Sequence, residues 1–258
     1  MKERILSALV GIPAILVLAW AGGYYWMILV LLMGVIGLWE FYRGIKASNH
    51  RPLWLAGFLV LLWALTMNSS TFSSAWGVAA LLLSILLLVI LYPRYHIIDV
   101  AASWFGALYV GILMGYIWKL STLPDHFWVI LFALLLTWAS DSGAYFIGKY
   151  FGKHKMAPRL SPNKTWEGFI GGFLATILVS LAGFWIMPGY RLYQYLALGI
   201  AVGLVAPVGD LFASGVKRGF NIKDFGRLIP GHGGVLDRLD SFMCVAPLVY
   251  LLVVRWGG

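Results

Sequence analysis

The most polar stretch of the chain runs from residue 209 to residue 241 and concentrates acidic and basic side chains. Its four acids and five bases are Asp210, Asp224, Asp237, Asp240, Lys217, Arg218, Lys223, Arg227 and Arg238. Carboxylates bind hard cations such as Mg²⁺, whereas lysine and arginine side chains bind phosphate. These residue types therefore indicate a site that handles phosphate groups with the help of a metal ion.

The spacing within this stretch indicates which side chains could meet. Asp237 and Asp240 are three residues apart, so on a helix they share one face. Asp210 can join them if the two apolar segments that carry these acids pack side by side. The glycine-rich segment 230–234 lets backbone approach a ligand closely. The sequence leaves open whether His232, within that segment, is a solvated loop residue or a phosphate contact.

A second polar stretch covers residues 138–172. It places Asp141 inside an apolar run, where an acid is either part of a functional site or a polar contact between helices. Thr165 and Glu167 are helix-start signals, so we expect a helix to begin near Thr165. Its free N–H groups, beside Lys164, could bind an anion. The alternative is a capped helix that follows an ordinary basic loop.

The elements that must position these residues are membrane helices. The chain has 258 residues, of which 61% are hydrophobic and 11% are charged, whereas soluble domains carry about 25% charged residues. The only cysteine, Cys244, excludes an internal disulfide and a cysteine-based metal site. The net charge of +9 does not indicate a nucleic-acid partner, because the basic residues stand at the ends of apolar runs. The predicted fold is an all-α polytopic integral membrane protein.

About nine apolar runs approach the 20 or so residues that a membrane-spanning helix needs. The predicted spans are 5–21, 24–42, 53–69, 75–92, 101–118, 127–148, 167–187, 194–214 and 239–256. This pattern divides the chain into a five-span apolar region, 1–118, and a four-span catalytic region, 119–258. The catalytic region carries two polar loops, 149–166 and 215–238, which we expect to face the cytoplasm.

The distribution of basic residues predicts the orientation. All of the 19 Lys and Arg residues except Lys119, Arg191 and Arg255 fall on the same side of this map as the N-terminus. Cytoplasmic loops carry the excess of Lys and Arg, so the N-terminus is predicted to be cytoplasmic and the C-terminus to lie outside. The first run also resembles a signal peptide, but Pro13 interrupts it and no polar mature domain follows, which favours an uncleaved span.

The polar segment also resembles a known family signature. The matching positions are Ser214, Val216, Lys217, Arg218, Lys223, Asp224, Gly226, Ile229, Pro230, His232, Gly233, Gly234, Val235, Asp237, Arg238, Leu239 and Asp240. This pattern resembles that of the phosphatidate cytidylyltransferases, or CDP-diacylglycerol synthases. The 138–172 stretch resembles the same family, whereas the first four or five spans match it only in being apolar. One position departs from the family, because Ala213 stands where an acid is usual.

The resemblance implies an enzyme that transfers CMP from CTP to phosphatidic acid, with CDP-diacylglycerol and pyrophosphate as products. The catalytic residues it implies are Asp210, Asp237, Lys217, Arg218, Lys223, Asp224 and Arg238. Mg²⁺, with room for a second cation, would be held by Asp210, Asp237, Asp141 and Asp240. The substrate-binding residues would be Lys164, Ser214, Arg227, His232, Gly233 and Gly234. CTP, phosphatidic acid and membrane lipid would be the partners, in a bacterial inner membrane with the site on the cytoplasmic side.

Two other functions stay open on the sequence. A CTP-dependent lipid-alcohol kinase would transfer the γ-phosphate instead of CMP, and labelled CTP distinguishes the two reactions. An ion or anion transporter would need charged groups that reach both sides of the membrane, whereas the predicted outer half is nearly free of them. The sequence does not decide between a monomer and a homodimer.

Overall fold

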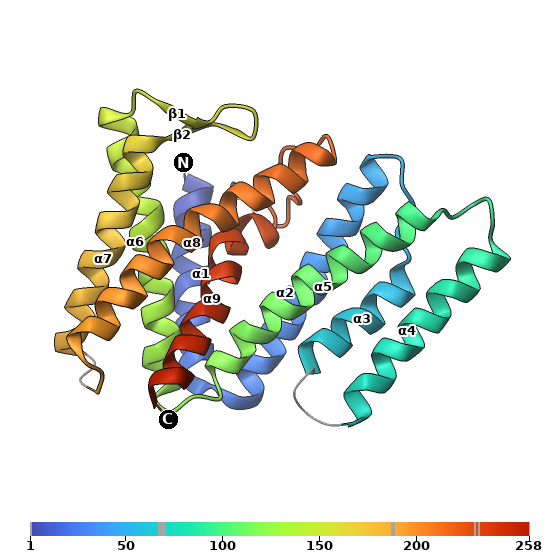
Figure 1. Cartoon of the computed structure of the whole chain (residues 1–258), viewed down its shortest axis with the longest axis horizontal. Coiled ribbons are helices and arrows are strands. Elements are labelled where there is room, and N and C mark those ends of the chain that lie inside the picture. Colours follow the sequence, from blue (N-terminus) through green and yellow to red (C-terminus); the bar gives the residue numbers. More distant parts are fainter. Residues whose placement is uncertain (1, 67–70, 187–188, 230, 232, 258) are drawn as a thin grey trace. The chain divides into compact units, whose positions relative to one another are not determined.

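The structure of the chain is a computed structural model that describes residues 2–66, 71–186, 189–229, 231 and 233–257. Helices dominate this part of the chain (Figure 1). They are α1 (Lys2–Ala21), α2 (Gly23–Ala47), α3 (Trp54–Thr66), α4 (Thr71–Ile90), α5 (Ile97–Leu120), α6 (His126–Phe151), α7 (Trp166–Ile186), α8 (Leu192–Gly219) and α9 (Leu236–Gly257). Two short antiparallel strands, β1 (Lys155–Ala157) and β2 (Ser161–Thr165), form a hairpin between α6 and α7.

The helices confirm an all-α membrane protein. Among the described residues, six helices are long and apolar enough to cross a membrane, namely α2, α5, α6, α7, α8 and α9. The remaining three, α1, α3 and α4, contain shorter apolar segments, of which Trp54–Leu65 in α3 is one. Part of the span expected at 53–69 lies outside the described residues. Nine spans and their orientation therefore stay a prediction.

The helices extend further into the polar segments than hydropathy indicates. Helix α8 continues to Gly219, and α9 begins at Leu236, so the loop predicted at 215–238 is shorter in the structure. Lys217 lies in the last turn of α8, and Asp237 lies in the first turn of α9. The physical reason is that a helix ends where its backbone hydrogen bonds end, and charged residues continue it readily beyond the apolar run.

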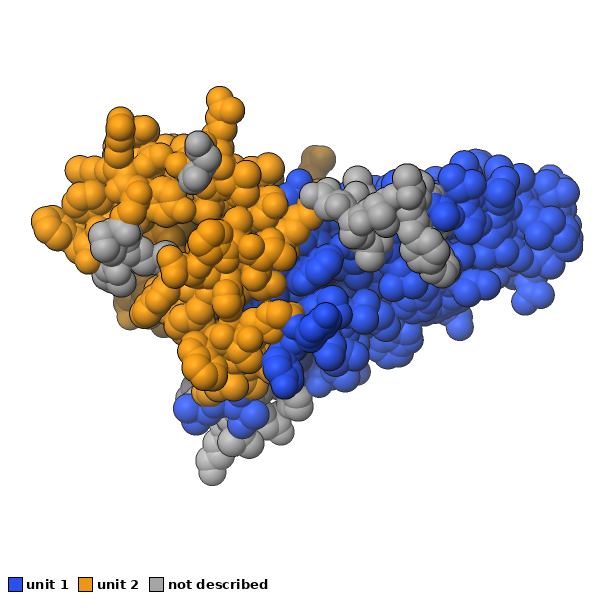
Figure 2. Space-filling view, turned by 90° about the horizontal axis from the view of Figure 1, so that it is seen from below, with its two compact units in different colours: residues 1–12, 24–118, 217–238 blue, residues 13–23, 119–216, 239–258 orange. Residues whose placement is uncertain are grey.

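The chain divides into two compact units, shown in different colours in Figure 2. Unit 1 comprises residues 1–12, 24–118 and 217–238, and unit 2 comprises residues 13–23, 119–216 and 239–258. The polar segment 217–238 therefore belongs to the same unit as α2 to α5. The remaining predicted site residues, from Asp141 to Ser214 and at Asp240, belong to unit 2.

In unit 1, helix α2 provides much of the core. The Phe41 ring lies edge-on to Phe220 at 5.2 Å between centroids and stacks on Phe225 at 6.0 Å. On the same helix, the buried Tyr42 donates a hydrogen bond of 2.8 Å to the carbonyl oxygen of Ser103 in α5. These contacts attach the loop that follows α8 to the end of α2, because aromatic pairs bury large apolar areas at a defined geometry.

In unit 2, helices α6 and α7 pack closely along their length, and the β1–β2 hairpin connects their ends (Figure 1). Small residues permit this approach. A Cβ atom added at Gly143 of α6 would lie 2.7 Å from the carbonyl oxygen of Gly171 in α7. Such close backbone contact is typical of helix pairs inside membranes, where small residues replace bulky ones at the interface.

Large apolar side chains cover much of the outer surface. Trp20, Val89, Leu178 and Trp185 are 71%, 71%, 68% and 82% exposed. Soluble proteins rarely expose so large an apolar area to water. Contact of these side chains with lipid agrees with the apolar character of the helices.

Candidate active site

The centre of the site in unit 1 is Asp237, whose side chain is 3% exposed. Its Oδ1 atom lies 2.8 Å from the ammonium nitrogen of Lys217, which is also buried. Its Oδ2 atom accepts hydrogen bonds from the backbone N–H groups of Phe225 at 2.9 Å and Gly234 at 3.0 Å, and from Gly226 at 3.5 Å. A buried carboxylate with a cation and several donors is well compensated. Asp237 thus joins α8, α9 and the loop between them.

Sequence reasoning missed Glu40, a fully buried residue of α2 that lies beside this cluster. Its two carboxylate oxygens accept hydrogen bonds of 3.0 Å from the backbone N–H groups of Val235 and Leu236, at the start of α9. The sequence does contain a signal for Glu40, because it is an acid within a long apolar run. A charge within a membrane segment is costly and is usually functional.

A polar cavity of about 480 Å³ opens beside this cluster, within unit 1. It is lined by Arg43, Gly44 and Ala47 from α2, together with Ile222, Lys223, Asp224, Phe225, Gly226 and Arg227 from the loop. Three of these side chains are cationic and exposed, and one is an acid. The cavity has the size and the charge to receive a phosphate-bearing ligand. Arg43 is a second residue that the sequence did not single out as part of a site, because it counted only among the basic residues that predict the orientation.

The other predicted residues of unit 1 lie around this loop. The exposed Arg218 donates a hydrogen bond of 3.0 Å to the carbonyl oxygen of Ile222, which stabilises the turn after α8. Arg238 is also exposed. The N–H of Ile229 donates to the carbonyl oxygen of Gly233 at 2.9 Å, and these two residues form an isolated antiparallel β-bridge. Pro230 and His232 lie outside the described residues, so the role predicted for His232 stays a prediction.

Unit 2 contains a second lysine–carboxylate pair. The Lys164 ammonium lies 2.7 Å from Oδ2 of Asp210 and donates to the carbonyl oxygen of Pro207 at 3.2 Å. The Ser214 hydroxyl donates to Oδ1 of Asp210 at 3.4 Å. Three residues predicted from the sequence are thus brought together, from the hairpin and from α8. This pair is more accessible than the first, because its side chains are 23% and 32% exposed.

The start of α7 confirms the expected helix boundary. The Thr165 hydroxyl accepts a hydrogen bond of 3.2 Å from the N–H of Gly168, the geometry of an N-terminal cap. Glu167, in the first turn, accepts from His154 Nδ1 at 2.6 Å and from the backbone N–H of Lys153 at 3.1 Å. These bonds connect the first turn of α7 to the chain just after α6, ahead of the hairpin that carries Lys164.

The remaining predicted metal ligands are Asp141 and Asp240, both in unit 2. Oδ1 of Asp240 accepts a hydrogen bond of 2.8 Å from the N–H of Ser241, and Asp141 is an exposed residue of α6. Within the described part of the chain, no group of three or more His, Cys, Asp or Glu side chains is placed to hold a metal ion. The metal ligand set therefore stays a prediction.

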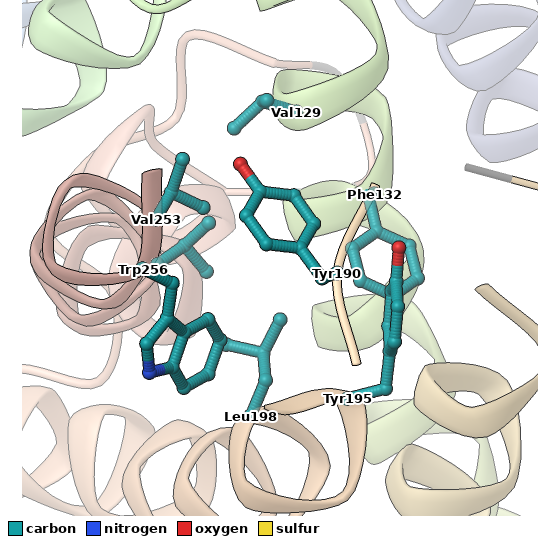
Figure 3. A pocket seen from close by; sticks show the side chains of 8 residues that line it. Val129, Phe132, Tyr190, Tyr195, Leu198, Val253 and Trp256 are labelled. Carbon is teal, nitrogen blue, oxygen red and sulfur yellow. The ribbon is translucent and has the colours of Figure 1, made fainter. Parts of the chain in front are cut away.

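An apolar cavity in unit 2 provides a contrast to the polar one (Figure 3). It encloses only about 20 Å³ and is lined by Val129, Phe132, Tyr190, Tyr195, Leu198, Val249, Val253 and Trp256. The rings of Tyr190 and Tyr195 lie 6.2 Å apart, as in an aromatic core. Burial, assisted by the negative charge of Asp125, raises the pKa of the Tyr190 phenol, so it stays neutral. This cavity is a packing feature and offers no group for phosphate chemistry.

The apolar helices, with one lysine–carboxylate pair in each unit, define a helical membrane protein that carries charged clusters of the kind that bind phosphate. Residues 2–256 match the sequence profile of the Cytidylyltransferase family, and the chain belongs to that family. Phosphatidate cytidylyltransferases of Staphylococcus haemolyticus and Staphylococcus epidermidis are 34% identical to it over 261 and 264 residues. The enzyme of the same name from Staphylococcus aureus is 34% identical over 265 residues. Each alignment covers 99% of this chain and 100% of the relative.

Proposed function

We propose that this protein transfers CMP from CTP to phosphatidic acid and so forms CDP-diacylglycerol and pyrophosphate. The observation that carries this proposal is the match of residues 2–256 to the Cytidylyltransferase family, with relatives of that activity over nearly the full length. The arrangement around Asp237 and the cationic cavity beside it support the proposal, because both substrates are polyanions.

The reaction requires two phosphate-bearing molecules to meet against their mutual repulsion. Arg43, Lys223 and Arg227 line the cavity and are exposed, so their charges are available to phosphate oxygens. Preorganised cations of this kind stabilise charge in a transition state without reorganising solvent. We assign the cavity to one of the substrate phosphates. We also assign Lys164, which already lies beside Asp210, to phosphate contact.

The nucleophile can come from the lipid itself. A phosphate monoester has a second pKa of about 6, so its oxygen is ionised near neutral pH. One such oxygen attacks the α-phosphorus of CTP, a new P–O–P bond forms, and the bond to the β-phosphate breaks with pyrophosphate as the leaving group. No proton has to be removed from the attacking oxygen, so the protein need not supply a general base. Its side chains orient the two phosphates and hold their charge.

The predicted cofactor is Mg²⁺, and the donor chemistry fits it. The leading candidate ligands are the carboxylates of Asp210 in unit 2 and Asp237 in unit 1, with Asp141 and Asp240 as further candidates, and carboxylate oxygens are the hard donors that Mg²⁺ prefers. Bound Mg²⁺ would supply positive charge to the CTP phosphates. In this structure both leading carboxylates are paired with lysines, Lys164 and Lys217. Each lysine compensates the negative charge of its carboxylate.

The proposal includes the place of the protein in the cell. We propose nine spans, a cytoplasmic N-terminus and an active site on the cytoplasmic side of a bacterial inner membrane. The distribution of Lys and Arg supports the orientation, and the bacterial relatives support the membrane. Cytosolic CTP could then reach a lipid whose acyl chains stay in the bilayer.

Labelled CTP tests the activity directly. Purified protein is incubated with Mg²⁺, phosphatidic acid in detergent micelles, and CTP labelled at either the α- or the γ-phosphate. We expect the α-label to enter the lipid fraction and the γ-label to appear in pyrophosphate. Transfer of the γ-label to lipid would identify a kinase instead. If neither label enters the lipid under conditions in which a staphylococcal relative is active, both activities are refuted.

A further inference from the structure

Glu40 is the one acidic side chain of α2, and it is completely buried. It accepts the N–H of Val235 through Oε1 and the N–H of Leu236 through Oε2, both at 3.0 Å. Residues 40 and 236 are 196 positions apart in the chain. The first N–H groups of a helix have no partner within that helix. Glu40, in α2, therefore caps the first residues of α9, and those residues up to Arg238 lie in the same unit.

The loop backbone is shaped to fit this carboxylate. A Cβ atom added at Gly226 or Gly234 would overlap with the carboxylate oxygens of Glu40. Glycine at both positions thus lets two parts of the loop approach the same side chain.

Glu40 and Asp237 divide the same run of backbone donors between them. Asp237 accepts the N–H of Gly234, and Glu40 accepts the next two N–H groups along the chain. The residue that follows those two donors is Asp237 itself. The direction of the Asp237 side chain therefore depends on a backbone turn that Glu40 holds.

We propose that Glu40 is a positioning residue for the reaction. It fixes the first turn of α9, so that Asp237 and its partner Lys217 stay where phosphate chemistry needs them. This inference rests on the proposed function for its catalytic consequence, but its structural part can be tested without activity. It also gives α2, an apolar helix without a recognised motif, a direct part in building the site.

The test compares Glu40→Gln and Glu40→Asp with a matched control, Ser84→Ala. Ser84 is buried in the same unit and accepts a hydrogen bond of 3.0 Å from Trp104 Nε1, away from this loop. Glutamine keeps the length of the side chain but turns one acceptor into a donor, which faces an N–H group. Aspartate keeps the charge but is one methylene shorter. The control reports what the loss of any buried hydrogen bond does to this unit.

The first readout is amide hydrogen exchange of the peptide that spans residues 234–241. We expect exchange there to speed up by about tenfold or more in Glu40→Gln, because a hydrogen bond to a charged acceptor is lost. Exchange in α6 and α7 should not change, and Ser84→Ala should leave 234–241 at the wild-type rate. Wild-type exchange of this peptide in both Glu40 variants would overturn the proposal, whatever the activity of the protein.

The second readout is steady-state kinetics. We expect kcat to fall by about tenfold to a hundredfold in Glu40→Gln while the KM for CTP stays within about threefold, because the reacting geometry is disturbed more than ground-state binding. The kcat of Glu40→Asp should lie between that of Glu40→Gln and that of the wild type. An equal loss of kcat in Ser84→Ala would show a general loss of stability and would overturn the positioning role. If Glu40→Gln cannot be purified as folded protein, the same two criteria apply to Glu40→Asp.

Discussion

The Lys217 ammonium and the Asp237 carboxylate form a buried ion pair, with 2.8 Å between Nζ and Oδ1, that links the last turn of α8 to the first turn of α9. Both side chains are nearly excluded from solvent, at 11% and 3% exposed. Three loop N–H groups donate the remaining hydrogen bonds to the Asp237 carboxylate. The pair therefore has a structural role, and the catalytic role that we propose for it can be tested separately by experiment.

Removing one partner of this pair should destabilise the fold. Asp237→Asn leaves the Lys217 charge buried without compensation, which costs about 3–5 kcal/mol. The double variant Lys217→Met with Asp237→Asn should be less destabilised than the sum of the two single variants. Thermal unfolding in detergent measures this coupling. If the stability losses of the two single variants add exactly in the double variant, the two side chains do not interact.

The same carboxylate should be required for activity. We expect Asp237→Asn to lower kcat by at least about a hundredfold at a temperature where it is still folded, the scale of losing one preorganised charged group. Asp125→Asn is the control, because it removes an exposed acid distant in sequence from the signature. Activity within threefold of wild type in Asp237→Asn would remove Asp237 from the catalytic residues.

The accessible pair of Lys164 and Asp210 should behave differently. Its side chains are 23% and 32% exposed, and partly exposed ion pairs contribute about 1 kcal/mol or less. Lys164→Gln should leave the unfolding temperature nearly unchanged but raise the KM for CTP about tenfold, because a charged donor to phosphate is lost. Lys155→Gln, in the same hairpin, is the matched control. Loss of folded protein in Lys164→Gln alone would show a structural role instead.

Arg43 offers a test of the polar cavity. Arg43→Gln should raise the KM for one substrate by about tenfold to a hundredfold, because a charge-assisted hydrogen bond contributes about 1.5–3 kcal/mol. Lys46→Gln removes one positive charge from the same helix end, and Lys46 does not line the cavity. Equal effects of the two variants would indicate long-range charge attraction and not a contact in the cavity.

Removal of divalent cations should separate activity from folding. We expect EDTA to abolish CMP transfer and Mg²⁺ to restore it, whereas the helical circular dichroism signal stays constant throughout. The fold should persist because Lys217 and Lys164 already compensate Asp237 and Asp210. Undiminished turnover in excess EDTA would exclude the proposed Mg²⁺ requirement.

Cysteine labelling in intact cells tests the orientation. In a background with Cys244→Ala, a membrane-impermeant maleimide should label Thr122→Cys from outside and should label Arg159→Cys only after the cells are opened. Both positions are exposed in loops of unit 2. The opposite pattern would place the hairpin that carries Lys164 on the outside, where cytosolic CTP cannot reach it.

The sequence by itself determined the class of fold, the family and most of the residues near the two ion pairs. Apolar runs of span length are a local property, because a membrane forces every backbone group to be satisfied within its own helix. The signature from Ser214 to Asp240 is also local. The helix start at Thr165 was predictable for the same reason, since an N-terminal cap involves residues only three positions apart.

Only the tertiary structure decided which side chains from distant segments meet. The sequence contained no sign that Glu40 would accept hydrogen bonds from Val235 and Leu236, or that Arg43 would line a cavity with Lys223. It also did not show that Asp237 pairs with Lys217. These contacts depend on how helices pack and on which loop conformation satisfies buried donors. Both are non-local, because burial of a charge is permitted only where the folded chain supplies its partners.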